Sequence, residues 1–272
     1  MSTRAGTVLE RIVAETREEL ERRKRDVPQA ALERAGAARD APDGRPFRDA
    51  LLAPGVSVIA EFKRRSPSAG TLREDPDLAE VLAAYQRGGA AALSILTEGP
   101  NFGGSLADLR TARDACGLPL LRKDFVLDSY QLHEARAAGA DAVLLIVAAL
   151  KPDELSSLYA TARAIGLDVL VEVHDREELH TALALEAEIV GINNRDLRDF
   201  SVDVERTERL MDDVPASVAA VSESGIATAE QLRRLHERGV QAVLVGESLM
   251  RSADPAVALR ELKSFSEARE TL

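Results

Sequence analysis

The sequence predicts a closed (β/α)8 barrel with an extra helix before its first strand. Short apolar runs alternate with amphipathic helical stretches, which is typical of a parallel sheet whose strands are joined by helices. Eight such runs occur, and 272 residues is an ordinary length for a single barrel domain. We therefore expect one domain over residues 1–272, in which residues 1–55 form a helical extension packed on the barrel mouth. An open doubly wound sheet is the alternative, but the glycine-rich turn that usually follows its first strand is missing.

The first element is predicted to be a helix that ends before Pro28. Thr7 and Glu10 have the spacing of a capping box. The stripe expected to face the protein recurs at helical spacing and comprises Leu9, Ile12, Val13, Thr16 and Leu20. Residues 27–55 hold much of the Pro and Gly of the chain and are expected to be a connecting extension.

The eight apolar runs are expected to be the barrel strands, in chain order. They begin near Val56, Ala90, Leu118, Asp141, Asp168, Ile189, Ser217 and Gln241. Helix starts between them are marked by capping signals at Asp75-Pro76, Ser105, Pro152 and Thr228. In the first of these, Asp75 is expected to be the N-cap and Pro76 the first helical residue.

Composition disfavours several classes of partner. The net charge is −11 and the isoelectric point is near 5.0, so neither a nucleic acid nor an anionic membrane is expected as a partner. No apolar run is long enough to span a membrane, and the N-terminal segment lacks the apolar core of a signal peptide. The single cysteine, Cys116, cannot form an internal disulfide, which fits a reducing compartment. We therefore expect a cytoplasmic protein, and a locally basic pocket for an anionic metabolite is compatible with this composition.

The first expected strand ends in charged residues, Glu61 and Lys63. The two are separated by one residue, so their side chains lie on the same side of the strand. Burying unpaired charge is costly, so they are either exposed at an ordinary strand end or form an acid–base pair in a pocket. The pocket is favoured because polar residues also follow most of the other strands.

In a barrel, the C-terminal ends of all strands meet at one mouth, where the active sites of this fold lie. The polar residues expected at these ends include Glu61, Lys63, Ser66, Lys123, Glu172, Asn193, Arg195 and Glu223. Taken singly, most have an ordinary explanation: Lys123 as a surface lysine, or Asn193 as a turn residue. Glu172 is more specific, because it stands between apolar residues within a strand. Two lysines and three carboxylates in one mouth would shift one another's pKa values, which is typical of acid–base sites.

The ends of the last two strands are candidate phosphate sites. Ser224 and Gly225 follow the seventh strand, and Gly246 and Glu247 follow the eighth. Many barrels bind phosphate at these positions through backbone N–H groups, and glycine allows a ligand to approach the backbone closely. Ordinary turns between strand and helix are the alternative.

Nine segments, spread in order along the chain, together form a recognisable set of motifs. They are EFKRRSPS from Glu61, LTE from Leu96, FGGS from Phe102, LRKDF from Leu121, LLIV from Leu144, VEVH from Val171, GINNRDL from Gly191, SESGI from Ser222 and VGESLM from Val245. The set resembles the indole-3-glycerol phosphate synthase family. The resemblance covers all eight expected strands and the extra helix, from about residue 5 to residue 265, without a departure at the catalytic positions.

The resemblance implies a reaction of tryptophan biosynthesis. The substrate, 1-(2-carboxyphenylamino)-1-deoxyribulose 5-phosphate, closes a ring and loses CO2 and water to give indole-3-glycerol phosphate. The family uses no metal ion or organic cofactor, and the four histidines of this chain do not show metal-ligand spacing. The implied partner is this small phosphosugar, and other enzymes of the tryptophan pathway are candidate partners. The chain is shorter than family members that carry fused partner domains.

The resemblance also implies catalytic roles. Lys123 is the acid that protonates the ketone oxygen during ring closure, oriented by Glu61 or Asp124. Glu172 and Lys63 serve the dehydration, and the resemblance leaves open which lysine acts at which step.

Further residues are implied to hold the substrate or to orient the catalytic groups. Asn193 and Glu223 hydrogen-bond the sugar hydroxyls or orient the lysines, and Arg195 contacts the carboxylate. The aromatic ring is flanked by Phe102, Phe125, Leu144 and Leu197. The phosphate end is formed by Ser66, Ser224, Gly225, Gly246 and the backbone N–H of Glu247.

Three other functions fit a barrel with such a mouth. A ketose isomerase acting on phosphoribosylanthranilate would need one acid and one base rather than two lysines. A Schiff-base aldolase using Lys123 would be trapped by borohydride in the presence of substrate. A non-catalytic barrel would bind a phosphometabolite and leave it unchanged.

Overall fold

The structure is a computed structural model that describes residues 7–39, 46–197 and 200–267. Eight parallel strands close into a barrel in chain order, and the last strand pairs with the first. They are β1 (Ser57–Phe62), β4 (Ala92–Leu96), β5 (Leu120–Lys123), β6 (Ala142–Ile146), β7 (Asp168–Val173), β8 (Ile189–Asn193), β9 (Ala219–Glu223) and β10 (Ala242–Val245). Each begins within two residues of its expected position, so the predicted barrel is confirmed.

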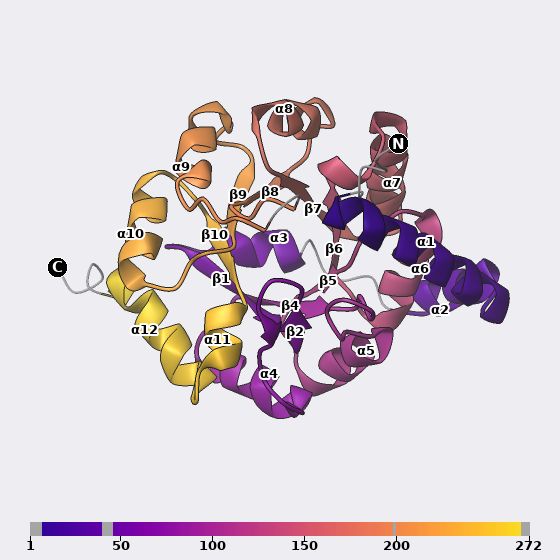
Figure 1. The fold of residues 1–272 in the computed structure, drawn as a ribbon, viewed down its shortest axis with the longest axis horizontal. Helices are drawn as coiled ribbons and strands as arrows, with labels where there is room; N and C mark the ends of the chain where they lie inside the picture. Colours follow the sequence, from indigo (N-terminus) through magenta and orange to yellow (C-terminus); the bar gives the residue numbers. More distant parts are fainter. Residues whose placement is uncertain (1–6, 40–45, 198–199, 268–272) are drawn as a thin grey trace, which may run out of the picture.

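Helices surround the barrel and connect its strands (Figure 1). They are α4 (Leu78–Arg87), α5 (Leu106–Ala115), α6 (Ser129–Ala138), α7 (Pro152–Ala164), α8 (Arg176–Ala184), α9 (Arg206–Leu210), α10 (Ala229–Glu237), α11 (Glu247–Arg251) and α12 (Pro255–Glu267), with 3-10 turns η1 (Val147–Ala149) and η2 (Met211–Asp213). A short hairpin of β2 (Arg65–Ser66) and β3 (Gly70–Thr71) follows β1. Among the described residues, no helix is both long enough and apolar enough to cross a membrane.

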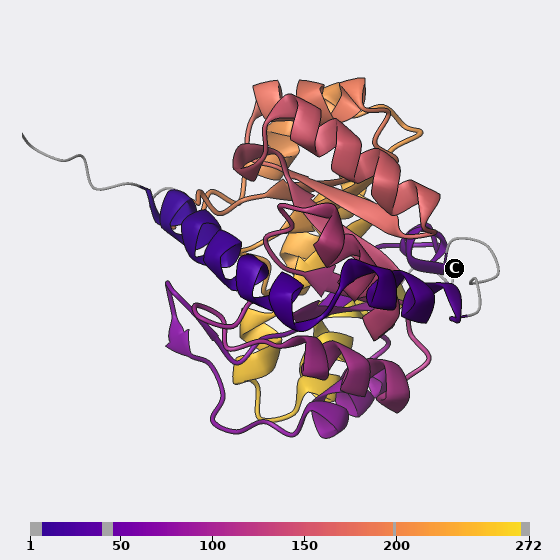
Figure 2. The ribbon, with the colours of Figure 1, turned by 90° about the vertical axis from the view of Figure 1, so that its right-hand side faces the viewer.

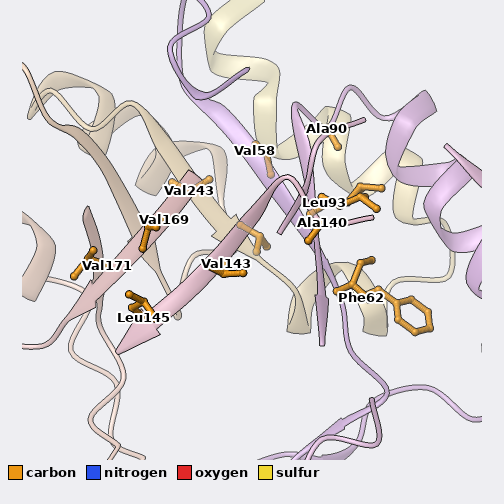
Figure 3. Packing of buried hydrophobic residues seen from close by; sticks show 14 of the residues in the cluster. Val58, Phe62, Ala90, Leu93, Ala140, Val143, Leu145, Val169, Val171 and Val243 are labelled. Atoms are coloured by element: carbon orange, nitrogen blue, oxygen red, sulfur yellow. The ribbon is translucent and has the colours of Figure 1, made fainter. Parts of the chain in front are cut away.

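Alternation along the strands divides the core into two layers. Residues such as Val58 and Val143 point outward and pack against the helices (Figure 3). The residues that alternate with them along each strand, such as Ile59 after Val58, point inward and fill the barrel. Because the period of two continues past the end of β1, Glu61 and Lys63 follow Ile59 on the inner side.

Within residues 7–39 and 46–56, three helices precede the first strand, and they lie at different places on the barrel. α1 (Val8–Asp26) lies at the mouth, where Ile12 packs with side chains of the barrel interior. α2 (Gln29–Ala37) packs on α6. α3 (Pro46–Leu51) lies at the opposite end of the barrel from α1, as Figures 1 and 2 together show. The described part of residues 27–55, expected as a connecting extension, thus contains two helices.

The capping signals locate the helix starts with one exception. At α1 the capping box is complete: the backbone N–H of Glu10 donates to Thr7 Oγ1, and that of Thr7 donates to the Glu10 carboxylate. The helix expected to be capped by Asp75 is capped instead by Asp77, whose carboxylate accepts from the N–H of Glu80 at 2.9 Å. Asp75 has a φ of 38° and lies outside the helix.

α3 closes the end of the barrel away from the mouth. Phe47 and Leu51 are fully buried in the cluster that contains the inward-facing strand residues. The backbone N–H of Arg48 donates to Asp168 at the start of β7 (2.9 Å). This helix therefore completes the apolar core of the barrel without approaching the strand ends at the mouth.

Phe47→Ala is expected to lower the free energy of unfolding by about 3–5 kcal/mol, because it removes a fully buried ring and leaves a cavity. Urea denaturation measures this change. Leu52→Ala is the control, because Leu52 is 44% exposed and its truncation should change stability by less than about 0.5 kcal/mol. Equal stability of the two variants would contradict the role of α3 in the core.

Candidate active site

A cavity of about 580 Å³ lies at the C-terminal ends of the barrel strands. This volume is in the range of sites that take small molecules. All sixteen site residues expected from the sequence line it: Glu61, Lys63, Ser66, Phe102, Lys123, Phe125, Leu144, Glu172, Asn193, Arg195, Leu197, Glu223, Ser224, Gly225, Gly246 and Glu247. The structure thus brings these residues together from the ends of all eight strands.

Lys123 lies among the charged side chains of the cavity. Its Nζ is 3.3 Å from Glu172 Oε2 and 3.3 Å from Glu223 Oε2. Asn193 Nδ2 donates to the other oxygen of Glu172 at 3.1 Å. These groups meet because each occupies an inward-facing position at or near the end of its strand. The ammonium is therefore held between two buried carboxylates.

These charges shift one another's pKa values. Burial opposes the charge of Lys123, but the neighbouring carboxylates, chiefly Glu223 and Glu172, outweigh it and raise the pKa of the ammonium. Burial also opposes the charge of Glu172, but Lys123 and His174 outweigh it and lower its pKa. At Glu223 burial prevails, and with the charge of Glu172 it raises the pKa to about 7 in spite of Lys123. Two neighbouring carboxyl groups with separated pKa values are typical of acid–base sites.

Lys63 forms a second ion pair in the cavity, with its Nζ 2.5 Å from Glu61 Oε1. Of the two residues expected to orient Lys123, Asp124 forms an ion pair with Arg122 at 2.8 Å, whereas the charge of Glu61 is among those that raise the pKa of Lys123. The two carboxylates within ion-pair distance of Lys123 are those of β7 and β9, described above. The cause is strand alternation: the Lys123 side chain points into the barrel, whereas Arg122 points away from it.

Two glycines leave room for the carboxylates. A Cβ atom at Gly191 would lie 2.3 Å from Glu223 Oε1, and one at Gly246 would lie 2.4 Å from Glu61 Oε1. Any other residue at these positions would therefore displace a carboxylate or distort its strand. Gly246 is expected from the sequence only as part of a phosphate site, and Gly191 is not among the expected site residues. A glycine in the interior of a strand was the available signal, since it indicates close approach of another group.

An apolar wall lies beside the charged groups. The rings of Phe102 and Phe125 are tilted against each other, with 6.4 Å between their centroids. Both rings pack in the cluster that fills the barrel, together with Leu144 and Leu197. A planar aromatic ligand would find its complement on this side of the cavity.

The part of the cavity formed after β9 exposes a strained turn. Ser224 and Gly225 have φ values of 66° and 79°, and this left-handed conformation is strained for serine. Asn194 holds the turn by donating from Nδ2 to the Ser224 carbonyl at 3.0 Å. A Cβ atom at Gly225 would lie 2.7 Å from a methyl group of Val202. Glycine is therefore required at this turn both by conformation and by the close approach of Val202.

Arg195 supplies a cation on this side of the cavity. Its Nη1 donates to the Phe200 carbonyl at 3.1 Å, and its Nη2 lies 3.8 Å from Glu247 Oε2. The Arg195 side chain is 23% exposed, so it can meet an anionic ligand without full desolvation.

Several lining residues are not among those expected from the sequence. They include Leu96, Ile146, Phe200, Val202, Val204 and Arg251. The apolar residues among them carry no pattern that distinguishes a cavity wall from a core. His174 is also absent from the expected site residues, although it contacts Glu172 from beside the cavity and its position two residues after Glu172 was a signal for a shared side of the strand.

Comparisons with known proteins agree on one family. A family model described as "Indole-3-glycerol phosphate synthase" matches residues 9–262. A relative from Streptomyces coelicolor named "Indole-3-glycerol phosphate synthase 2" is 50% identical over 255 residues, which cover 94% of this chain and 98% of the relative. The indole-3-glycerol phosphate synthase of Rhodopirellula baltica is 47% identical over 257 residues, with coverage of 94% and 98%.

Solved structures support the fold at much lower identity. A thiamine phosphate pyrophosphorylase from Pyrococcus furiosus superposes with a TM-score of 0.60 at 19% identity, covering 82% of this chain and 98% of that chain. This likeness concerns the barrel alone. The family model and the relatives at 47–50% identity show that the chain belongs to the indole-3-glycerol phosphate synthase family.

Proposed function

We propose that this cavity converts 1-(2-carboxyphenylamino)-1-deoxyribulose 5-phosphate into indole-3-glycerol phosphate, CO2 and water. The observation that carries this proposal is the Lys123 ammonium held between Glu172 and Glu223 at the barrel mouth. The cavity also has an apolar wall for an aromatic ring and glycine-containing turns for a phosphate. These parts match the ring, the ketone and the phosphate of one substrate.

Ring closure is assigned to Lys123 as the acid. The ring carbon that bears the carboxylate attacks the ketone carbon, and the ketone oxygen takes a proton from Nζ as the new bond forms. Loss of CO2 from the same ring carbon then restores aromaticity. The carboxylates of Glu172 and Glu223 keep Lys123 charged and in place before this step.

Dehydration is assigned to Glu172 together with the Glu61–Lys63 pair. The oxygen that Lys123 protonates is the oxygen that leaves as water, so the second acid must reach the same atom. Glu172 meets this requirement because its Oε2 is 3.3 Å from Lys123 Nζ. The proton lost from the carbon next to nitrogen goes to Glu61, which Lys63 holds at 2.5 Å, and returns from there to Lys123.

Substrate binding is assigned to the remaining lining residues. Phe102, Phe125, Leu144 and Leu197 would flank the anthranilate ring, and Arg195 would meet its carboxylate. Asn193 would orient Glu172, to which it donates a hydrogen bond. The phosphate would lie against Ser66, Ser224, Gly225, Gly246 and the backbone N–H of Glu247.

The single-domain organisation over residues 1–272 is proposed to include α1 as a cover of the mouth. Two contacts support this placement: Ile12 packs with the barrel interior, and Asn101 Nδ2 donates to Glu15 Oε2 of α1 at 3.0 Å. A covered mouth would exclude water and strengthen the electrostatic interactions inside.

A cytoplasmic location and contact with other enzymes of the tryptophan pathway complete the proposal. The single cysteine, Cys116, supports the first, because it leaves no internal disulfide to maintain. The chemistry of the substrate supports the second, since another enzyme must supply the phosphosugar.

A Schiff-base mechanism is disfavoured by the surroundings of Lys123. A lysine that attacks a carbonyl must be neutral, and enzymes achieve this by lowering its pKa. The two carboxylates at 3.3 Å act in the opposite direction and raise it. Proton donation is therefore the chemistry that this lysine suits.

Lys123→Ala is expected to lower kcat by about 10²–10⁴-fold, the usual contribution of a positioned acid. Turnover is measured by the indole fluorescence of the product, for which the background is low because the chain contains no Trp. The matched control is Arg64→Ala, which removes a cation that pairs with Asp108 away from the cavity and should keep most of the activity. A folded Lys123→Ala enzyme with normal turnover refutes the assignment.

Glu172→Gln is expected to reduce kcat by at least about 10²-fold while KM changes little, because the amide keeps the shape but cannot cycle a proton. Steady-state kinetics provides both values, and circular dichroism checks that the fold is intact. A change confined to KM would show that Glu172 binds the substrate without taking part in proton transfer.

Gly191→Ala is expected to reduce kcat by about 10-fold or more, because its Cβ would occupy the place of Glu223 Oε1, and a displacement near 1 Å can cost up to about 10²-fold. Gly117→Ala is the matched control, since a Cβ there meets nothing within 4 Å. Product fluorescence of the two variants is compared at equal concentrations of folded protein. Equal activity would mean that the position of Glu223 is not critical.

A further inference from the structure

His174 follows β7 and lies beside the carboxylate of Glu172, outside the set of residues assigned above. Its Nε2 is 3.3 Å from Glu172 Oε1, and its Nδ1 is 3.0 Å from Glu178 Oε2. The His174 side chain is only 10% exposed. Its Nε2 is buried and lacks hydrogen-bond alignment with any partner among the described residues. A buried imidazole nitrogen thus lies 3.3 Å from the carboxylate to which the dehydration is assigned, with no other partner among the described residues.

A second cavity, of about 380 Å³, borders the imidazole on its other side. His174 and Glu178 line it, whereas the lining of the first cavity includes Glu172 and neither of these two residues. The contact between the His174 and Glu172 side chains therefore joins the outer cavity to the cavity at the barrel mouth. When a substrate fills the barrel mouth and α1 covers that mouth, water would still reach His174 through the outer cavity.

The proposed reaction needs a proton from outside. Loss of CO2 from a carboxylate and loss of water together consume one proton per turnover. The proton that Lys123 gives to the ketone oxygen is returned when the carbon next to nitrogen loses its proton. The proton that converts the hydroxyl into water is not returned, so the site must import it.

We propose that His174 is the proton reserve of Glu172 and supplies the one proton that each turnover consumes. This inference rests on the proposed function. After Lys123 has given up its proton, Glu172 keeps only one of the two cations that lie 3.3 Å from it, and it becomes more basic. The proton on His174 Nε2 then moves to Glu172 Oε1, and rotation of the carboxyl group brings this protonated oxygen to the departing hydroxyl, which takes the proton and leaves as water. The neutral imidazole keeps its Nδ1 proton on Glu178, and Nε2 regains a proton from water before the next turnover.

The groups around His174 favour a stored proton. Burial opposes the charge, but Glu172 and Glu178 outweigh it and raise the pKa of His174 to about 10. The backbone N–H of His174 also donates to Glu178 Oε2 at 2.8 Å, which fixes that carboxylate beside the ring. The other charged groups that line the outer cavity are Asp175, Arg176, Asp196, Arg206 and Arg209. The imidazole is thus held as a cation by the two carboxylates that it contacts.

His174→Gln tests the proposal, because glutamine keeps a polar side chain of similar length but cannot release a proton. The expected result is a fall of about 10–100-fold in kcat with KM within about 2-fold, and a solvent deuterium isotope effect on kcat larger than that of the wild type. The alkaline limb of the pH profile should move to lower pH, because Glu172 must then be protonated from bulk water. Imidazole added to His174→Ala should restore activity in proportion to its protonated form.

Two further variants keep the test decisive. His180→Gln is the control, since His180 is exposed on α8 and should keep wild-type kinetics. Glu178→Gln removes the outer carboxylate and should also move the alkaline limb to lower pH, which tests the reserve if His174→Gln does not fold. Wild-type kinetics and pH profiles in folded His174→Gln and Glu178→Gln would overturn the proposal.

A merely structural role is distinguished by the same measurements. It would lower kcat in His174→Gln without changing the isotope effect or the pH profile and without rescue by imidazole, and this result would also overturn the proposal. If the wild-type enzyme forms no indole product, the proposed function itself fails. If the wild-type enzyme forms the product and His174→Gln and Glu178→Gln have wild-type kinetics and pH profiles, the proposed function stands and only the proton-reserve proposal fails.

Discussion

The burial of the Lys123 ammonium between two carboxylates is the constraint on which the rest of the site depends. Desolvating a lone lysine would cost several kcal/mol, so Lys123 can occupy the barrel interior only with counter-charges in place. Glu172 and Glu223 supply them, but two carboxylates and one ammonium leave an excess of negative charge. The excess is accommodated by the raised pKa of Glu223 and by the imidazole beside Glu172. The same interaction thus stabilises the buried charges at the mouth and favours the protonated forms of Lys123, Glu223 and His174.

Strand alternation places these charged groups at the mouth of the barrel. Along each strand the outward residues pack against the helices and the inward residues fill the barrel. The inward series changes from apolar to charged at the mouth: Ile59 is followed by Glu61, and Leu170 by Glu172. Gly191 and Gly246 leave the volume that the carboxylates occupy. The apolar inward residues below the charged layer and the glycines beside it therefore both follow from the alternation of inward and outward residues along the strands.

The fold was predictable because its signals are local and repeated. Apolar runs recur eight times and capping signals mark four of the helix starts, so an error at one of them, such as Asp75, moves a helix start without changing the topology. The charged site was predictable for the same reason, since strand ends of a barrel must converge. α2 and α3 were not, because their short helices are specified by packing on α6 and on the barrel floor rather than by strong periodicity in residues 27–55.

What sequence reasoning could not supply is the partner of each charged group. It named Glu61 or Asp124 as the residue that orients Lys123, but Asp124 pairs with Arg122, and the carboxylates within 3.3 Å of the ammonium are Glu172 and Glu223. It overlooked His174, although the spacing of Glu172 and His174 equals that of Glu61 and Lys63. Both pairs consist of a carboxylate and a nitrogen-bearing side chain separated by one residue at a strand end. In β1 the pair is an ion pair inside the cavity. After β7 the histidine contacts Glu172 and Glu178 and lines the outer cavity, so the same spacing places the second residue inside the barrel cavity at one strand end and outside it at the other.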